Sequence, residues 1–324
     1  GNRADGYSVD RQSISLDKPV PMKVYFPLEN NHFEFQLNPT IKEPKTHYND
    51  QGTILAISDI ESGYKAFRDF LIANSVINQE LEWVFGNGHL VLVGDFTDRG
   101  YSTNQVLWFI YKLEQEAKPH GGTVHYILGN HEIKNLQGNF QKAGEKYLHI
   151  AAMLGKKEYE MFNDNAFLGR WLHSKNSVEL INGYLFVHGG IHPDIAKSDW
   201  SLKDINQIVR QNYRKAYFPT PEKNKDALLL SLTKGPSWYR GYFDNSLSQA
   251  EVESGLDKFG AKAVIVGHTP QVSINTQYQG RVIAIDVNHP KDYRDTFPSR
   301  HSEGLLIENN QTFRLLADGT KELL

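Results

Sequence analysis

The chain has 324 residues, of which 40% are hydrophobic and 23% charged, and its net charge is −3. This composition supports a sizeable core in one large domain or two small ones. The charge gives no reason to expect binding to nucleic acid or to an acidic membrane, and no apolar run reaches the length of a membrane span. The absence of cysteine excludes disulfides and a cysteine nucleophile.

The first residue is Gly1 rather than Met, which indicates a trimmed chain. The sequence therefore leaves the compartment open between a bacterial periplasm and a cytoplasm. We expect a monomer.

The N-terminal segment predicts a β-hairpin. Residues 20–26 and 32–37 alternate polar and apolar side chains on either side of Asn30-Asn31, and a loop with two prolines follows. We assign residues 1–50 to an N-terminal extension and residues 51–324 to the main domain.

The main domain opens with three apolar strands at residues 53–58, 90–93 and 123–128. Amphipathic helices are predicted between them, at 64–73 and 104–116. This alternation favours parallel strands with helical crossovers, and hence an α/β fold.

The second half of the chain mixes helices and strands. Residues 134–175 have a helical pattern typical of an insertion, and Asn182-Gly183 predicts the turn of a hairpin over 178–187. Further elements follow in chain order: helices at 202–217, 227–232 and 249–259, then strands at 263–266, 281–285, 304–307 and 312–315.

Five apolar strands end in loops that carry Asp, Asn or His. Open α/β sheets usually place their chemistry at the carboxyl ends of strands. The five loops read Ser58-Asp59-Ile60-Glu61, Gly94-Asp95-Phe96-Thr97-Asp98-Arg99-Gly100, Gly129-Asn130-His131-Glu132, His188-Gly189-Gly190 and Gly267-His268-Thr269.

This set of side chains predicts a metal site. Carboxylate, carboxamide and imidazole ligands together suit divalent metals such as Mn, Fe or Zn. The number of ligands suits two ions that share a bridging carboxylate, for which Asp95 is our choice. The predicted ligands are Asp59, Glu61, Asp95, Asn130, His188 and His268.

Four further residues have the chemistry of phosphate binding and proton transfer. Arg99 and Arg240 are planar donors suited to bidentate contact with a phosphate. His131 is suited to protonating a leaving oxygen, and Asp98 to holding its ring charged and oriented. Asp286 and His289 follow the strand at 281–285, and the sequence leaves site and structural roles open for both.

These motifs resemble the signature of the PPP-type metallophosphoesterases, the family of the serine/threonine protein phosphatases. Gly267-His268-Thr269-Pro270-Gln271 and Trp238-Tyr239-Arg240 are most similar to its Shewanella-like branch. The resemblance covers roughly residues 53 to 290. It implies a four-layer α/β/β/α sandwich with two mixed sheets and a two-metal site between them, and it assigns residues 51–324 as the catalytic domain.

One position departs from the family pattern. The first motif is usually Asp-x-His-Gly, but here it is Asp59-Ile60-Glu61-Ser62-Gly63. If Glu61 binds metal, its carboxylate makes the site harder and favours Mn, Mg or Ca over Zn. The alternative is a Glu61 that does not reach the metal.

Together these observations predict a metal-dependent phosphoprotein phosphatase in which a metal-bound hydroxide attacks phosphorus directly. The branch implies phosphotyrosine as the substrate, whereas the wider family implies phosphoserine and phosphothreonine. Two alternatives stay open: a hydrolase of dinucleoside polyphosphates, and a catalytically silent protein that only binds phosphopeptides.

Overall fold

Two six-stranded mixed sheets form the centre of the fold in the computed structural model. The structure describes residues 2–4, 7–9, 13, 15, 17–214, 225–294 and 300–324. The first sheet has the order β16-β15-β14-β6-β7-β8, with the bounds Lys321–Leu323, Gln311–Leu316, Glu303–Glu308, Ile54–Ile57, His89–Leu92 and Thr123–Tyr126. The second has the order β12-β13-β11-β10-β9-β5, with the bounds Asn275–Gln277, Val282–Ala284, Ala263–Val266, Tyr184–Val187, Val178–Ile181 and His47–Tyr48.

The predicted parallel pairing of the first three core strands is confirmed. β6 pairs with β7 and β7 with β8 in parallel register, Ile54 opposite His89 and Leu90 opposite Val124. All four residues of β6 and of β7 are buried, which explains why both strands are apolar apart from His89. The β9–β10 hairpin also forms as predicted, and its turn residues Asn182 and Gly183 both have positive φ.

Helices surround these sheets. Their bounds are α1 Tyr64–Ala73, α2 Thr103–Ala117, α3 Asn130–Gln137, α4 Glu145–Met153, α5 Phe167–His173, α6 Pro193–Ala196, α7 Leu202–Asn212 and α8 Gln249–Phe259. Short 3-10 helices occur at η1 Pro27–Glu29, η2 Lys118–His120, η3 Glu158–Met161, η4 Lys225–Leu228 and η5 Tyr278–Gly280.

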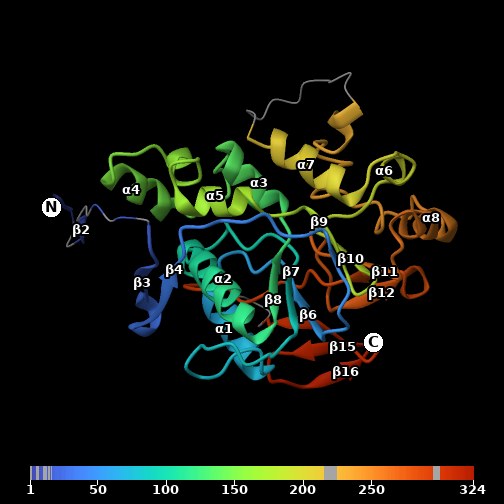
Figure 1. Ribbon diagram of the computed structural model, residues 1–324, viewed down its shortest axis with the longest axis horizontal. Coiled ribbons are helices and arrows are strands. Elements are labelled where there is room, and N and C mark those ends of the chain that lie inside the picture. The colour runs from blue at the N-terminus through green and yellow to red at the C-terminus, as the bar shows by residue number, and fades with distance from the viewer. Residues whose placement is uncertain are drawn as a thin grey trace.

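Most helix predictions agree with these bounds, and one is wrong. The chain makes only the 3-10 turn η4 and further turns where a helix was predicted over 227–232, and Gly235-Pro236 follows closely. The end of the helix predicted over 202–217 lies outside the described residues. The predicted insertion is helical, and α3, α4 and α5 lie along one edge of the molecule (Figure 1).

The core has two parts because alternate residues of each strand point in opposite directions. Ile54, Ala56 and Val91 of the first sheet pack between the sheets with Phe186 and Ile265 of the second. The intervening strand residues face the helices, where α2 packs against β8 and α7 against β9. The result is a two-sheet sandwich covered by helices, as predicted (Figure 1).

The N-terminal hairpin joins this core. β3 (Val20–Phe26) and β4 (Asn31–Leu37) pair as predicted, and the ring of Phe33 lies 5.4 Å from that of Phe109 on α2. Before the hairpin, β1 (Asn2–Ala4) and β2 (Tyr7–Val9) form a separate antiparallel pair. β5 belongs to the segment assigned to the extension, yet it pairs with β9 in the second sheet. The domain division at residue 51 stays a prediction.

Among the described residues, no helix combines the length and the apolar character that crossing a membrane requires.

Candidate active site

The loops after β6, β7, β10 and β11 meet where the two sheets adjoin. Backbone hydrogen bonds tie them together, from Asp59 N to Gly94 O and from Gly267 N to His188 O, each at 2.9 Å. A cavity of about 170 Å³ opens here, and the predicted residues that line it are Asp59, Glu61, Asp95, Arg99, Asn130, His131, Arg240 and His268. Asp98 and His188 lie behind this lining, in contact with His131 and Asp95 respectively. The structure thus brings every predicted site residue to one place.

The site is built on an unusual backbone. Left-handed φ values between 48° and 68° occur at Asp59, Glu61, Asp95, Asp98, Arg99 and His268. Such conformations cost energy for residues with a side chain and cluster at functional sites. Gly94 explains one close approach, since a Cβ there would lie 2.6 Å from both Nδ1 of His188 and Cα of Gly129.

Glu132 holds the central loop in this shape. Its carboxylate accepts hydrogen bonds from the backbone N–H groups of Asp95 and Phe96 at 2.9 Å, and of Gly129 at 3.0 Å. Glu132 is fully buried, so a loop with several orphan N–H donors gains an ionic acceptor away from water. The carboxylate of Glu132 therefore fixes the loop that carries Asp95 to the loop that carries Asn130.

Three of the predicted ligands converge closely. The ligand atoms of Asp95, His188 and His268 all lie within 4.8 Å of one another, and all three residues are buried. His188 has Nδ1 2.7 Å from the carbonyl of Val93, and His268 has Nε2 3.1 Å from the carbonyl of Trp238. Because each imidazole donates its N–H to a carbonyl, Nε2 of His188 and Nδ1 of His268 are left as ligand atoms.

The carboxamide of Asn130 completes this group. Its oxygen lies 3.0 Å from Oδ2 of Asp95 and 3.1 Å from Nδ1 of His268. Burial lowers the pKa of His268 to about 2, so its ring is neutral and both neighbours are acceptors. With the amide turned, its nitrogen donates to both acceptors and its oxygen accepts from Nζ of Lys134 at 2.9 Å. One carboxylate, two imidazoles and the adjacent carboxamide together form a donor set that fits a divalent metal ion.

The electrostatics of the cavity support the same fit. Burial, together with Asp95 and Glu61, raises the pKa of Asp59 to about 7. Burial and the charge of Asp59 also raise the pKa of Asp286, which lines the cavity, well above its usual value. Although burial alone would lower it, Asp95 and Asp59 raise the pKa of His188 to about 10. Buried carboxyl groups whose pKa values are raised are groups that a divalent ion would keep ionised.

His131 and Asp98 form the predicted pair. Nδ1 of His131 lies 2.7 Å from Oδ2 of Asp98, and the amide of Asn135 donates to Oδ1 at 3.0 Å. Burial alone would lower the pKa of His131, but Asp95 and Asp98 raise it above the ordinary value. Nε2 of the ring faces the cavity side, 3.8 Å from Oδ2 of Asp95 and 3.3 Å from a guanidinium nitrogen of Arg99.

The cationic groups are placed differently from one another. Arg99 forms an ion pair with Oε1 of Glu61, and Nζ of Lys291 lies 2.6 Å from Oε2 of the same carboxylate. Both oxygens of Glu61 are thus engaged by cations, outside the group of converging ligand atoms. Arg240 donates to the carbonyl of His268 at 2.5 Å and to Oγ1 of Thr269 at 3.1 Å. Metal binding by Glu61 and phosphate binding by the two arginines stay predictions.

Two basic residues at the site were not predicted from the sequence. Nζ of Lys134 lies 2.9 Å from the Asn130 carboxamide and lines the cavity, and Lys291 neutralises Glu61. Lys134 was detectable, since residues four apart share a helix face. Lys291 carried no sequence signal. Asp286, left undecided by its sequence, lies in the lining.

Comparison with known proteins agrees with this geometry. The model of the calcineurin-like phosphoesterase family matches residues 52–272. Shewanella-like protein phosphatase 1 of Plasmodium berghei is 30% identical over 68% of this chain and 62% of its own length. Shewanella-like protein phosphatase 2 of Arabidopsis thaliana is 25% identical over 78% of this chain and 75% of its own.

A solved structure is similar over most of the chain. The cold-active protein-tyrosine phosphatase of a psychrophilic Shewanella species superposes with a TM-score of 0.83 and 30% identity, covering 93% of this chain and 89% of that protein. The family match spans the loops that carry the converging ligands. The chain therefore belongs to the calcineurin-like phosphoesterases, in their Shewanella-like phosphatase branch, and is a metal-dependent phosphoesterase.

Proposed function

We propose that this protein is a phosphoprotein phosphatase that hydrolyses phosphotyrosine with two divalent metal ions. The observation that carries the proposal is the position of the His131–Asp98 pair at the cavity where the ligand atoms of Asp95, His188 and His268 converge. When bound, two such ions lower the pKa of a water molecule and offset the charge of a phosphoryl group. The residues that would hold these ions are Asp59, Asp95, Asn130, His188 and His268.

The chain's own residues supply the remaining chemistry. Arg99 and Arg240 bind phosphate oxygens, so the substrate competes with Glu61 for the guanidinium of Arg99. His131 donates the proton of Nε2 to the leaving oxygen, while Asp98 keeps the ring charged and oriented through Nδ1. A water molecule then returns a proton to Nε2 of His131. No covalent phosphoenzyme forms.

The preference for phosphotyrosine rests on two supports. The first is the similarity to a structure named as a protein-tyrosine phosphatase. The second is Glu61, which stands where the family usually has a histidine ligand, so the first metal would lack that imidazole. A phenolate leaves with less help from a proton donor than an alkoxide, so a perturbed first metal is better tolerated with aryl phosphates.

The test is a chelation and restoration assay on matched peptides that differ only in carrying phosphotyrosine or phosphoserine. Protein stripped with EDTA is expected to lose activity and regain it with one of Mn, Fe, Zn, Mg or Ca. The restored enzyme should release phosphate faster from the phosphotyrosine peptide. Equal rates on the two peptides would contradict the tyrosine preference and leave the phosphatase intact.

Two other outcomes would replace the proposal. Cleavage of diadenosine tetraphosphate without cleavage of either peptide would make the protein a dinucleoside polyphosphate hydrolase. Phosphopeptide binding with no turnover in metal-loaded protein would make it a silent binding protein. The His131–Asp98 pair argues against silence, because binding alone needs no proton donor.

A further inference from the structure

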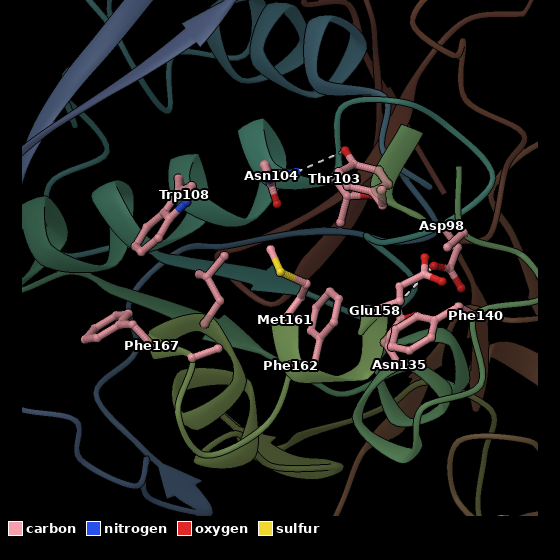
Figure 2. Close-up of a pocket in the computed structure, with 14 residues that line it drawn as sticks. Asp98, Thr103, Asn104, Trp108, Asn135, Phe140, Glu158, Met161, Phe162 and Phe167 are labelled. Atoms are coloured by element: carbon pink, nitrogen blue, oxygen red, sulfur yellow. Dashed lines mark hydrogen bonds between the residues drawn. The ribbon is translucent and has the colours of Figure 1, made fainter. Parts of the chain in front are cut away.

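A second cavity lies under the helical insertion, apart from the metal-ligand group. It has a volume of about 210 Å³ and lies among α2, α3, η3 and α5. Figure 2 shows Trp108 and Phe167 at one end and the carboxyl groups of Asp98 and Glu158 at the other, with Met161 and Phe162 between them. Asp98 separates this cavity from the imidazole of His131, to which it is bonded.

Aromatic rings line much of the cavity. At the apolar end the rings of Trp108 and Phe167 stack with centroids 5.8 Å apart, while those of Phe162 and Phe140 lie 5.9 Å apart in the middle and toward the polar end (Figure 2). These rings are only half-buried, so part of their surface faces the open volume. Aromatic faces of this kind attract both apolar groups and organic cations.

The polar end holds acceptors that the protein does not satisfy. Oδ1 of Asn135 is buried and has no hydrogen-bond partner among the described residues, although the residue is only 2% exposed. The carboxyl group of Glu158 makes no hydrogen bond or ion pair within the described part of the chain. By contrast, the hydroxyls of Thr103 and Tyr147, which also line the cavity, are bonded to protein atoms.

Two carboxyl groups lie at this end. Asp98 is paired with His131, whereas Glu158 has no such partner among the described residues, and burial together with the charge of Asp98 raises the pKa of Glu158. None of the described residues that line the cavity is Lys, Arg or His. The unsatisfied groups are all acceptors, so a ligand that complements them must donate, and a positive charge relieves the repulsion between the carboxylates.

Size limits the ligand further. An apolar protein cavity of about 150 Å³ holds one benzene molecule. A volume of about 210 Å³ therefore has room for one aromatic ring with a short chain attached. A bare metal ion or ammonium would leave the aromatic end unfilled.

We propose that this cavity is a binding site for an arylalkyl ammonium ion, with its ring against Trp108 and Phe167 and its ammonium group between Glu158 and Asn135. Nothing in the proposal depends on phosphatase activity, because binding is measured directly. The indole of Trp108 supplies a fluorescence signal inside the site.

The experiment compares two probes of similar shape on the whole protein, by tryptophan fluorescence and by calorimetry. Phenethylamine is expected to bind at least about tenfold more tightly than 2-phenylethanol, which lacks the charge. Glu158→Gln should reduce the affinity for phenethylamine to that for the alcohol. The control Glu145→Gln removes the same charge from α4 at an exposed position outside the lining and should change neither affinity.

A second variant keeps the proposal falsifiable if Glu158→Gln disturbs η3. Ala166→Phe places a ring inside the cavity and should abolish the binding of both probes while activity on para-nitrophenyl phosphate is retained. Equal affinity of the two probes for the wild-type protein would overturn the proposal. So would phenethylamine binding that survives Ala166→Phe. The last probe is N-acetyl-lysine amide, which carries an ammonium group without an aromatic ring. If it binds as tightly as phenethylamine, the natural occupant is a protein lysine, and the assignment of an aryl amine is overturned.

Discussion

The imidazole of His131 has a protonation state set by its neighbours. Asp95 and Asp98 raise its pKa despite burial, which favours the protonated ring that a leaving oxygen needs. A general acid works only while protonated, so activity should fall as the pH rises through this raised pKa.

Replacing His131 with Asn should remove this proton donor. Turnover of a phosphoserine peptide is expected to fall by roughly 10²–10⁴-fold. Turnover of para-nitrophenyl phosphate should fall less, because its leaving group is a weak base. The alkaline decline of kcat should also disappear. Metal content measured by mass spectrometry serves as the control and should be unchanged; wild-type turnover of the phosphoserine peptide would refute the acid role.

Glu61 has one role predicted from the sequence and different contacts in the structure. The motif predicts a metal ligand, while the structure engages both carboxylate oxygens with Arg99 and Lys291. A carboxylate paired in this way restrains Arg99 and weakens its contact with a substrate phosphate. Substitution of Glu61 distinguishes the ligand role from the ion-pair role.

Glu61→Gln is expected to release Arg99 without loss of metal. The inhibition constant of inorganic phosphate should decrease by about two- to fivefold, in line with the ~0.5–1 kcal/mol of a partly exposed ion pair. Arg99→Lys in the same background removes the bidentate fork and should cancel the gain. A drop of about one metal ion per chain in Glu61→Gln would instead identify Glu61 as a ligand.

Among the elements, the N-terminal hairpin contributes directly to the core. Phe33 is 4% exposed, and its ring lies 5.4 Å from Phe109 and 5.7 Å from Tyr64 on two different helices. Phe33→Ala should therefore lower the free energy of unfolding by about 3–5 kcal/mol, measured with urea. Tyr25→Ala provides the matched control in the same hairpin, since Tyr25 is 48% exposed and should cost less than about 1 kcal/mol. Similar losses for the two variants would mean that the hairpin does not pack on α1 and α2.

The sequence predicts elements well where local pattern decides the outcome. The strand-and-loop units, the turn at Asn182-Gly183 and the ligand group around Asp95 all follow from short stretches with a clear physical signal. Contacts between distant segments carry no such signal. Two such contacts depend on the completed fold: β5 pairs with β9, and Lys291 approaches Glu61. Near residue 230 the apolar pattern predicts a helix, but the chain forms turns there.

At the scale of the whole molecule, the predicted metal ligands come from both sheets. Asp59 and Asp95 follow strands of the first sheet, while His188 and His268 follow strands of the second. Without metal, the site keeps carboxylates whose pKa values burial and mutual repulsion raise, including Asp59 and Asp286. Metal binding should therefore stabilise the sandwich as well as supply chemistry.

Chelation is accordingly expected to lower the melting temperature by several degrees, because a ligand at 100 times its Kd adds about 2.7 kcal/mol per site to the folded state. The shift should be reversed by the same metal that restores activity. Asp95→Asn weakens metal binding at the residue predicted to be shared by both ions, so the melting temperature of this variant should respond little to EDTA. An identical response of wild type and Asp95→Asn would show that EDTA acts elsewhere. If EDTA leaves the wild-type melting temperature unchanged, the metal does not stabilise the contact between the sheets. The predicted ligands would then be held in place by hydrogen bonds within the protein, such as those to Glu132 and to the carbonyl of Val93.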